Sequence, residues 1–156
     1  FLRFRIRSRN YIHIVQISSI INNIHFHIPL FYPCRAGIDS LSVSPDGTIY
    51  ACHHFFGDRR FILGSVYDKI FNKNTLAPYR ITVEERSECR ECPARLVCGG
   101  PCYHRCLAVT GDISLCNRKE CIRKKALLKE IIIFYNELKK SDYDSFHWFI
   151  NKGKEF

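Results

Sequence analysis

The sequence feature that most constrains this chain is a run of four cysteines between residues 89 and 102. It reads Cys89-Arg-Glu-Cys92-Pro-Ala-Arg-Leu-Val-Cys98-Gly-Gly-Pro-Cys102. The thiols are separated by two, five and three residues, and the Gly-Gly-Pro lets the backbone turn tightly before the last of them. This spacing is typical of cysteines that bind a metal together, and we call residues 89–102 the array. Five more cysteines flank it: Cys34, Cys52, Cys106, Cys116 and Cys121.

The cysteine count and the N-terminal residues indicate a reducing environment. The chain has 156 residues, of which 46% are hydrophobic, enough for one domain with a modest core. Nine cysteines is an odd number, whereas a secreted disulfide scaffold normally has an even one. The N-terminal residues contain no apolar run of signal-peptide length. We therefore expect a cytoplasmic protein with metal-bound thiols.

The net charge of +9 raises the question of a nucleic-acid partner. A 4Fe–4S cluster with four thiolates carries a charge of about −2, so two clusters would offset about 4 of this surplus. The basic residues are also scattered along the chain and form no stripe with aromatic residues. We expect neither a nucleic-acid partner nor a membrane partner, because apolar runs of about 18 residues are absent from the sequence.

The spacing of the thiols favours a polynuclear cluster over zinc. Thiolates select zinc or iron–sulfur clusters. A structural zinc site usually takes two Cys-x-x-Cys-like pairs, and this chain has one, Cys89 to Cys92. Gaps of five and three residues suit a cluster whose irons draw ligands from several loops. The alternative is a zinc-stabilised, non-catalytic binding module, for which the charge suggests nucleic acid.

The pattern around the flanking cysteines predicts a β-hairpin. Apolar residues alternate with serines before a Pro45-Asp46-Gly47 turn, and Thr48-Ile49-Tyr50 follows the turn as a second strand. A simple register sets Cys52 opposite about Ser40. Cys34 must then curl back to share a site with Cys52.

Other segments predict an α+β fold class, a small cysteine-rich domain with cluster-binding loops and a long C-terminal helix. Residues 3–9 alternate as in a strand, and Asn22-Asn23 marks a break within residues 11–30. A further short strand is expected at residues 61–66. The helix begins at about Lys119, where its N-terminal N–H groups would favour a Cys121 thiolate.

The cysteine pattern carries a family resemblance. Cys34, twelve residues, Gly47, four residues and Cys52, followed by the array and a final cysteine, resemble the SPASM domain. That domain is the C-terminal auxiliary-cluster domain of radical SAM peptide- and protein-modifying enzymes. The short motifs around these cysteines also resemble that domain, and the resemblance covers about residues 34–130. They are Cys34-Arg-Ala-Gly37, Ser44-Pro-Asp-Gly47, Tyr50-Ala-Cys52-His53 and Cys98-Gly-Gly.

The resemblance implies two auxiliary 4Fe–4S clusters with interleaved ligands. The first would take Cys34, Cys52 and Cys102, and the second would take Cys89, Cys92, Cys98 and a last cysteine. Cys121 is preferred as the last ligand because it lies near the start of the predicted helix, and Cys116 is the alternative. The first cluster then has an open iron that could bind substrate or accept Cys106 or Cys116, unless both are free thiols, the reading we favour slightly. His53 and His54 are ligands, proton carriers or, as we expect, an exposed or hydrogen-bonded pair.

The resemblance also implies what this stretch of chain lacks. The family's SAM-cleaving cluster uses a Cys-x-x-x-Cys-x-x-Cys motif, which is absent from the sequence. The chain alone is therefore expected not to cleave SAM, and whether it counts as an enzyme stays open. The implied partners are a missing N-terminal radical SAM barrel, a ribosomal peptide or protein substrate, and an electron donor such as flavodoxin or ferredoxin.

The implied role is electron relay and substrate positioning for oxidative peptide modification, such as thioether formation. On this view residues 1–33 are the remnant of the upstream barrel or a linker. Residues 34–125 are the twin-cluster domain, and residues 126–156 are the C-terminal helix and tail.

Overall fold

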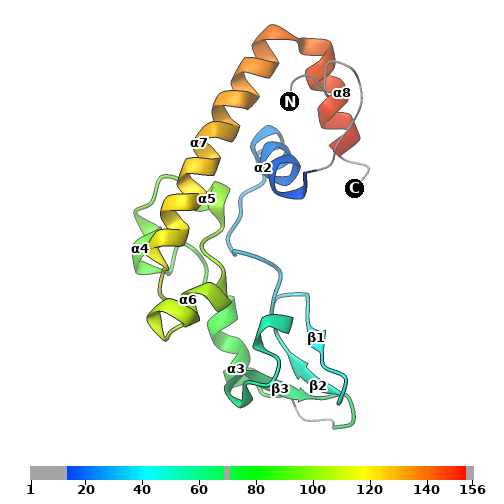
Figure 1. Cartoon of the computed structure of the whole chain (residues 1–156), viewed down its shortest axis with the longest axis vertical. Helices are drawn as coiled ribbons and strands as arrows, with labels where there is room; N and C mark the ends of the chain where they lie inside the picture. The colour runs from blue at the N-terminus through cyan, green and yellow to red at the C-terminus, as the bar shows by residue number, and fades with distance from the viewer. Residues whose placement is uncertain (1–13, 69–70, 154–156) are drawn as a thin grey trace. The chain divides into compact units, whose positions relative to one another are not determined.

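The computed structural model describes residues 14–68 and 71–153, which form two compact units (Figure 1). One unit comprises residues 30–122 and the other combines residues 14–29 with 123–153. The predicted α+β class is confirmed, because a small antiparallel sheet accompanies the helices. The strand predicted at residues 3–9 lies outside the described residues. The domain boundaries predicted above stay a prediction.

The sheet of the residue 30–122 unit has three antiparallel strands in the order β1-β2-β3 (Figure 1). They are β1 (Ser42–Val43), β2 (Thr48–Tyr50) and β3 (Ile62–Ser65). The third is the strand predicted at residues 61–66. Ser42 pairs with Tyr50 in the hairpin, the register that sets Cys52 opposite Ser40 as predicted.

A tight turn precedes the hairpin at residues 35–40. The Gly37 N–H donates to the Ser40 carbonyl at 3.0 Å, and the Ser40 N–H donates to the Arg35 carbonyl at 3.2 Å. Ala36 also forms an isolated bridge to Ser40. The backbone after Cys34 therefore folds back towards the strand end that Cys52 leaves.

Short helical segments carry most of the chain between the sheet and the long helix. Residues 73–80 form one α-helical turn followed by a 3₁₀ turn. The helix predicted from about Lys119 is present as α7. The segments of this unit are η1 (His53–Phe55), η2 (Arg59–Phe61), α3 (Lys73–Leu76), η3 (Ala77–Arg80), α4 (Ser87–Arg90), α5 (Arg95–Cys98), α6 (Tyr103–Thr110) and the start of α7 (Arg118–Ser141).

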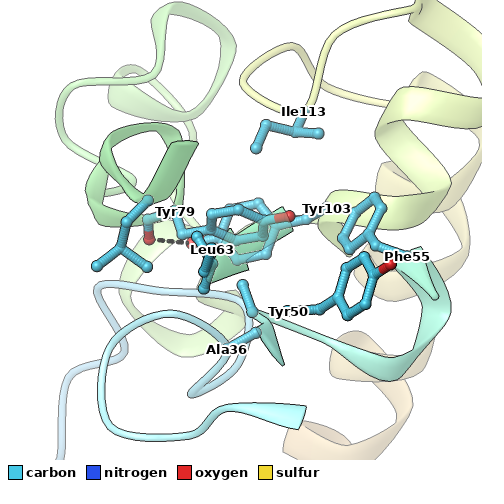
Figure 2. Close-up of a cluster of buried hydrophobic side chains, with 9 residues drawn as sticks. Ala36, Tyr50, Phe55, Leu63, Tyr79, Tyr103 and Ile113 are labelled. Carbon is cyan, nitrogen blue, oxygen red and sulfur yellow. Dashed lines mark hydrogen bonds between the residues drawn. The ribbon is translucent and has the colours of Figure 1, made fainter. Parts of the chain in front are cut away.

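Aromatic side chains form the core of this unit (Figure 2). Tyr79 and Tyr103 meet edge to face, with ring centroids 5.0 Å apart, and Phe55 packs on Tyr79 at 5.9 Å. The Tyr103 hydroxyl donates to the Tyr79 carbonyl at 2.7 Å, the dashed line in Figure 2. Rings of this size bury about 150–250 Å² each. The packing of these rings stabilises the loops that carry the cysteines.

The second unit contains α2 (Val15–His25), the continuation of α7 and α8 (Tyr143–Gly153). Its core comprises Ile21, Ile131, Tyr135, Leu138, Phe146, Phe149 and Ile150. The break predicted at Asn22-Asn23 is wrong, because α2 runs through both residues. Burial of Ser18 and Ile21 on one face outweighs the weak helix propensity of asparagine. Among the helices of the described residues, none has the length and apolar content needed to span a membrane.

Candidate metal centre

All nine cysteines lie within the described residues, and none of them forms a disulfide there. Six of them fall into two sets, which differ in the groups whose pKa they shift. We call Cys34 and Cys52, which act on Tyr79, the first thiol group. We call Cys89, Cys98, Cys116 and Cys121, which act on one another, the second thiol group.

The array residues fold into two single-turn helices. Cys89 lies in α4 and is buried, and the Cys92 N–H donates to the Cys89 carbonyl at 2.8 Å. Cys98 is the last residue of α5 and is half-buried. The array thus presents its first three thiols from one short, locally hydrogen-bonded stretch.

Gly99 and Gly100 redirect the chain after Cys98. Both have positive φ, +67° and +91°, in the left-handed region that favours glycine. Pro101 is fully buried, and Cys102 then caps the N-terminus of α6. Cys102 therefore stands at the start of a different helix from the one that ends at Cys98. The division of the array between two clusters stays a prediction.

The segment that leads to Cys34 docks against the array. The Leu30 N–H donates to the Leu96 carbonyl at 2.7 Å. A Cβ built on Gly99 would lie 2.3 Å from the Tyr32 carbonyl oxygen, so only glycine allows this approach. The array thereby fixes the backbone on which Cys34 enters the fold.

Cys116 contacts Cys89, with their sulfurs 3.4 Å apart. This thiol–thiol hydrogen bond is the main cause that lowers the pKa of Cys89, and it raises the pKa of Cys116. A cluster binds its thiolates on different irons, whose separation exceeds a direct thiol contact. The contact therefore suits Cys116 as a partner of a ligand.

Polar contacts of Asn117 and Arg105 hold the loop that carries Cys116. The Asn117 amide donates to the Arg105 carbonyl at 3.1 Å, and its oxygen accepts from the N–H groups of Lys119 and Glu120 as an N-cap of α7. The Arg105 guanidinium pairs with the Glu120 carboxylate at 2.8 Å. These contacts tie α6 to the start of α7.

Cys121 lies in the first turn of α7. Burial raises the pKa of Cys121 to about 11, and the nearby thiols Cys116 and Cys98 add to the rise. The expected effect of the helix N-terminus on its thiolate stays a prediction. Whether Cys121 or Cys116 is the last ligand stays a prediction.

Cys106, one turn after Cys102 in α6, is fully buried. Burial raises its pKa, and Cys116 and Cys102 add to the rise. It therefore lies beside the second thiol group and close to Cys102. The sequence left Cys106 open as a first-cluster ligand or a free thiol, and this position makes it a neighbour of both predicted sites.

Arg86 is a buried residue that the sequence reasoning missed. It is 2% exposed, and none of its three guanidinium nitrogens has a hydrogen-bond partner in the described part of the chain. The guanidinium lies 5.0 Å from the centroid of the Tyr103 ring. Its charge favours thiolates at Cys89, Cys106 and Cys116. The only sequence signal was its position three residues before Cys89.

Tyr79 is the corresponding buried group beside the first thiol group. Its side chain is fully buried, and its hydroxyl has no hydrogen-bond partner within residues 14–68 and 71–153. Burial raises the pKa of Tyr79, and Cys52 and Cys34 add to the rise. The Tyr79 hydroxyl is therefore a buried donor near these two thiols that has no acceptor among the described residues.

The histidines after Cys52 form a stack with a third histidine from α6. The His53 and His54 rings are 4.1 Å apart, and His54 stacks on His104 at 5.0 Å. Desolvation lowers the pKa of His54, and His53 and His104 add to the effect. His53 and His54 are both exposed, which fits the expectation of an exposed or hydrogen-bonded pair.

A single metal ion is a poorer fit than a cluster. Within residues 14–68 and 71–153, no three His, Cys, Asp or Glu side chains gather tightly enough to hold one ion. Soft thiols from several loops, a buried cation without an acceptor and a buried hydroxyl without one suit a larger anionic, sulfur-rich group. The residues present therefore fit iron–sulfur clusters.

A surface pocket of about 250 Å³ lies next to the turn that follows Cys34. It is lined by residues 37–41 together with Phe71, Leu76 and Arg80. A second pocket of about 370 Å³ shares these last three residues. The two form adjoining depressions beside the first thiol group's own loop, with apolar walls and a cationic side chain.

Comparisons with known proteins agree with the thiol chemistry. Residues 34–93 match the SPASM family, an iron–sulfur cluster-binding domain, and the match contains Cys34, Cys52, Cys89 and Cys92. The chain is also similar to an uncharacterized protein of Archaeoglobus fulgidus, with 36% identity over 85 residues. That alignment covers 52% of this chain and 20% of the relative, so the chain matches about a fifth of that protein's length.

Proposed function

We propose, from the premise that residues 34–93 carry an iron–sulfur cluster-binding SPASM domain, that this chain is the auxiliary-cluster part of a radical SAM peptide maturase. It would hold two 4Fe–4S clusters. Cys34, Cys52 and Cys102 bind the first, and Cys89, Cys92 and Cys98 bind the second with Cys121 as the last ligand. Such clusters supply one-electron transfer when bound.

The observation that carries this proposal is the second thiol group around a buried cation. Cys89, Cys98, Cys116 and Cys121 come from α4, α5, a loop and α7, yet the Cys116 sulfur lies 3.4 Å from the Cys89 sulfur, and Cys98 and Cys121 oppose the lowering of the Cys89 pKa. Arg86 supplies a buried positive charge beside them. A sulfur-ligated anionic cluster satisfies both features, because it binds thiolates and neutralises the cation.

The residues of the chain have three tasks in this proposal. The cysteines bind the clusters, the tyrosine core excludes water from between them, and the pocket beside residues 37–41 holds part of a peptide. The apolar walls of Phe71 and Leu76 suit a side chain, and Arg80 suits a carbonyl or carboxylate. This arrangement supports substrate positioning next to the first cluster.

The remaining partners follow from the family. A radical SAM barrel would bind and cleave SAM, a flavodoxin or ferredoxin would supply electrons, and a ribosomal peptide or protein would be the substrate. The product would carry an oxidative modification such as a thioether. We place this assembly in the cytoplasm, where thiols stay reduced. The chain alone would hold clusters without turning over SAM.

Anaerobic reconstitution of the chain tests the proposal. We expect about eight irons and about eight sulfides per chain, with the absorbance of 4Fe–4S clusters. Cys106 was left open as a first-cluster ligand or a free thiol, and a Cys106→Ala variant should load fully if this thiol is free. Stoichiometric zinc without sulfide would reject the proposal in favour of the zinc-stabilised binding module.

A further inference from the structure

The buried guanidinium of Arg86 points to a role that its position in the sequence does not reveal. We propose that Arg86 is the counter-charge of the second cluster, which raises that cluster's reduction potential. The proposal rests on the proposed function, because it needs the cluster to be present. Arg86 is a positioning and tuning residue in this account, since it acts on the cluster's charge and binds no iron.

The first step is the cost of the residue when no anion is present. A buried charge without hydrogen bonds is among the least favourable groups that a fold can contain. Arg86 is 2% exposed, and its Nε, Nη1 and Nη2 atoms have no hydrogen-bond acceptor among the described residues. The Tyr103 ring at 5.0 Å compensates only part of this cost.

The second step is that the nearby carboxylates have other partners. Glu88 is exposed, accepts from the Ser87 hydroxyl at 2.9 Å and lies 3.5 Å from the Cys116 N–H. Asp112 is exposed and accepts from the N–H and hydroxyl of Ser114 at 2.7 and 2.6 Å. Neither carboxylate is an acceptor for the guanidinium, although its charge helps to lower the pKa of both. The guanidinium therefore has no hydrogen-bonded protein anion within the described residues.

The third step is the position of the thiols. Arg86 shares a helical turn with Cys89, since the Cys89 N–H donates to the Arg86 carbonyl at 3.0 Å. The guanidinium also acts on Cys106 from α6 and on Cys116 from the loop before α7. An anionic cluster held by the second thiol group places its charge in this region. The cation that is unfavourable without the cluster becomes favourable with it.

The consequence for electron transfer has a definite sign. Reduction adds one negative charge to the cluster, and a fixed cation at short range in a low-dielectric site stabilises the reduced state more than the oxidised state. Arg86 thus raises the reduction potential. Loss of its charge lowers the potential, so the reduced fraction falls at any fixed electrode potential.

A spectroscopic redox titration of the reconstituted full chain tests the sign. We expect Arg86→Met and Arg86→Gln to lower the ratio of reduced to oxidised second cluster at least tenfold at fixed potential, which corresponds to about 59 mV for one electron. Arg86→Lys keeps the charge and should stay within about threefold of the wild type. Arg90→Met is the matched control, because Arg90 is an exposed cation of α4. Its ratio should change less than about twofold.

Urea unfolding of the metal-free chain supplies a readout independent of the cluster. We expect Arg86→Met to unfold at the same urea concentration as the wild type or a higher one, because it removes an unpaired buried charge. Equal destabilisation of the metal-free and loaded forms would assign Arg86 a packing role and overturn the inference. So would an unchanged potential in a fully loaded Arg86→Met. A wild-type chain that takes up no iron and sulfide would instead reject the proposed function, and this inference with it.

Discussion

The two thiol groups differ in what surrounds them, although both consist of cysteines. Cys34 is exposed and Cys52 is half-buried, and the buried group beside them is the neutral hydroxyl of Tyr79. In the second group Cys89 is buried, and the buried group beside it is the cation Arg86. The same ligand chemistry therefore meets two electrostatic environments. We expect the second cluster to be the more easily reduced and the better shielded from solvent.

The strongest test of this comparison removes one ligand from each site. Cys89→Ala should lose about four of the eight irons and leave the first cluster, because its thiol belongs to the second group. Cys102→Ala should lose the same amount but leave the second cluster. Iron analysis with electron paramagnetic resonance distinguishes the two species.

Cys102 is the informative member of that pair, because it lies in the array and yet is assigned to the first cluster. Loss of the second cluster alone in Cys102→Ala would break the assignment. Loss of both clusters would show that the two sites are not independent.

A second pair of substitutions sharpens the membership of the second group. Cys121→Ala should lose the second cluster, whereas Cys116→Ala should keep it and change its spectrum. The reason is that the Cys116 and Cys89 sulfurs are 3.4 Å apart, closer than two ligands of one cluster would lie. Iron content of the two purified variants gives the answer. The opposite result would make Cys116 the last ligand.

A third substitution tests the contact between the array and the segment that leads to Cys34. Gly99→Ala should destabilise the metal-free chain by about 2–4 kcal/mol, because the new Cβ meets the Tyr32 carbonyl and the backbone is left-handed. Gly111→Ala is the control, since Gly111 has φ +78° and open space around it. Its cost should be only about 1–2 kcal/mol.

Urea unfolding under reducing conditions measures both glycine variants. Equal costs would show that the approach of the Cys34 segment to the array contributes nothing to stability. A larger cost for Gly99→Ala, together with weaker loading of the first cluster, would show that the array holds that segment in place.

The smallest expected effect concerns the two buried tyrosines. Tyr103→Phe removes the donor to the Tyr79 carbonyl and should cost about 1–3 kcal/mol. Tyr79→Phe removes a hydroxyl without a partner in the described residues, so the metal-free chain should be as stable as the wild type or slightly more stable. Thermal unfolding of the metal-free variants compares them. A large cost in Tyr79→Phe would mean that its hydroxyl already has a partner.

Local sequence patterns predicted the elements whose residues are neighbours along the chain. The Pro45-Asp46-Gly47 turn set the hairpin register, and so the position of Cys52 opposite Ser40. The helical stripe after Lys119 predicted α7. These predictions succeeded because turn chemistry and periodicity are local properties. The break predicted at Asn22-Asn23 was wrong because the burial of Ser18 and Ile21 outweighs the weak helix propensity of asparagine.

The environment of the thiols could not be predicted in the same way. Arg86 is one of 24 lysines and arginines, and nothing in the neighbouring residues marks it as buried. The contact between Cys89 and Cys116 joins a helix to a distant loop through contacts of Asn117 and Arg105. Such properties depend on tertiary packing, which spacing rules do not contain. Thiol spacing therefore predicted a cluster, and tertiary structure was needed to distinguish the surroundings of its ligands.

The docking of Leu30 and Tyr32 on the array has a consequence for the order in which the sites assemble. The ligands proposed for the second cluster all follow Cys89, so short loops close around them. The proposed first cluster would need Cys34 and Cys102, and Cys34 enters the fold where residues 30–33 contact Leu96 and Gly99. We therefore expect cluster insertion to proceed from the second proposed site to the first. The first site would then fill only in chains that have already folded.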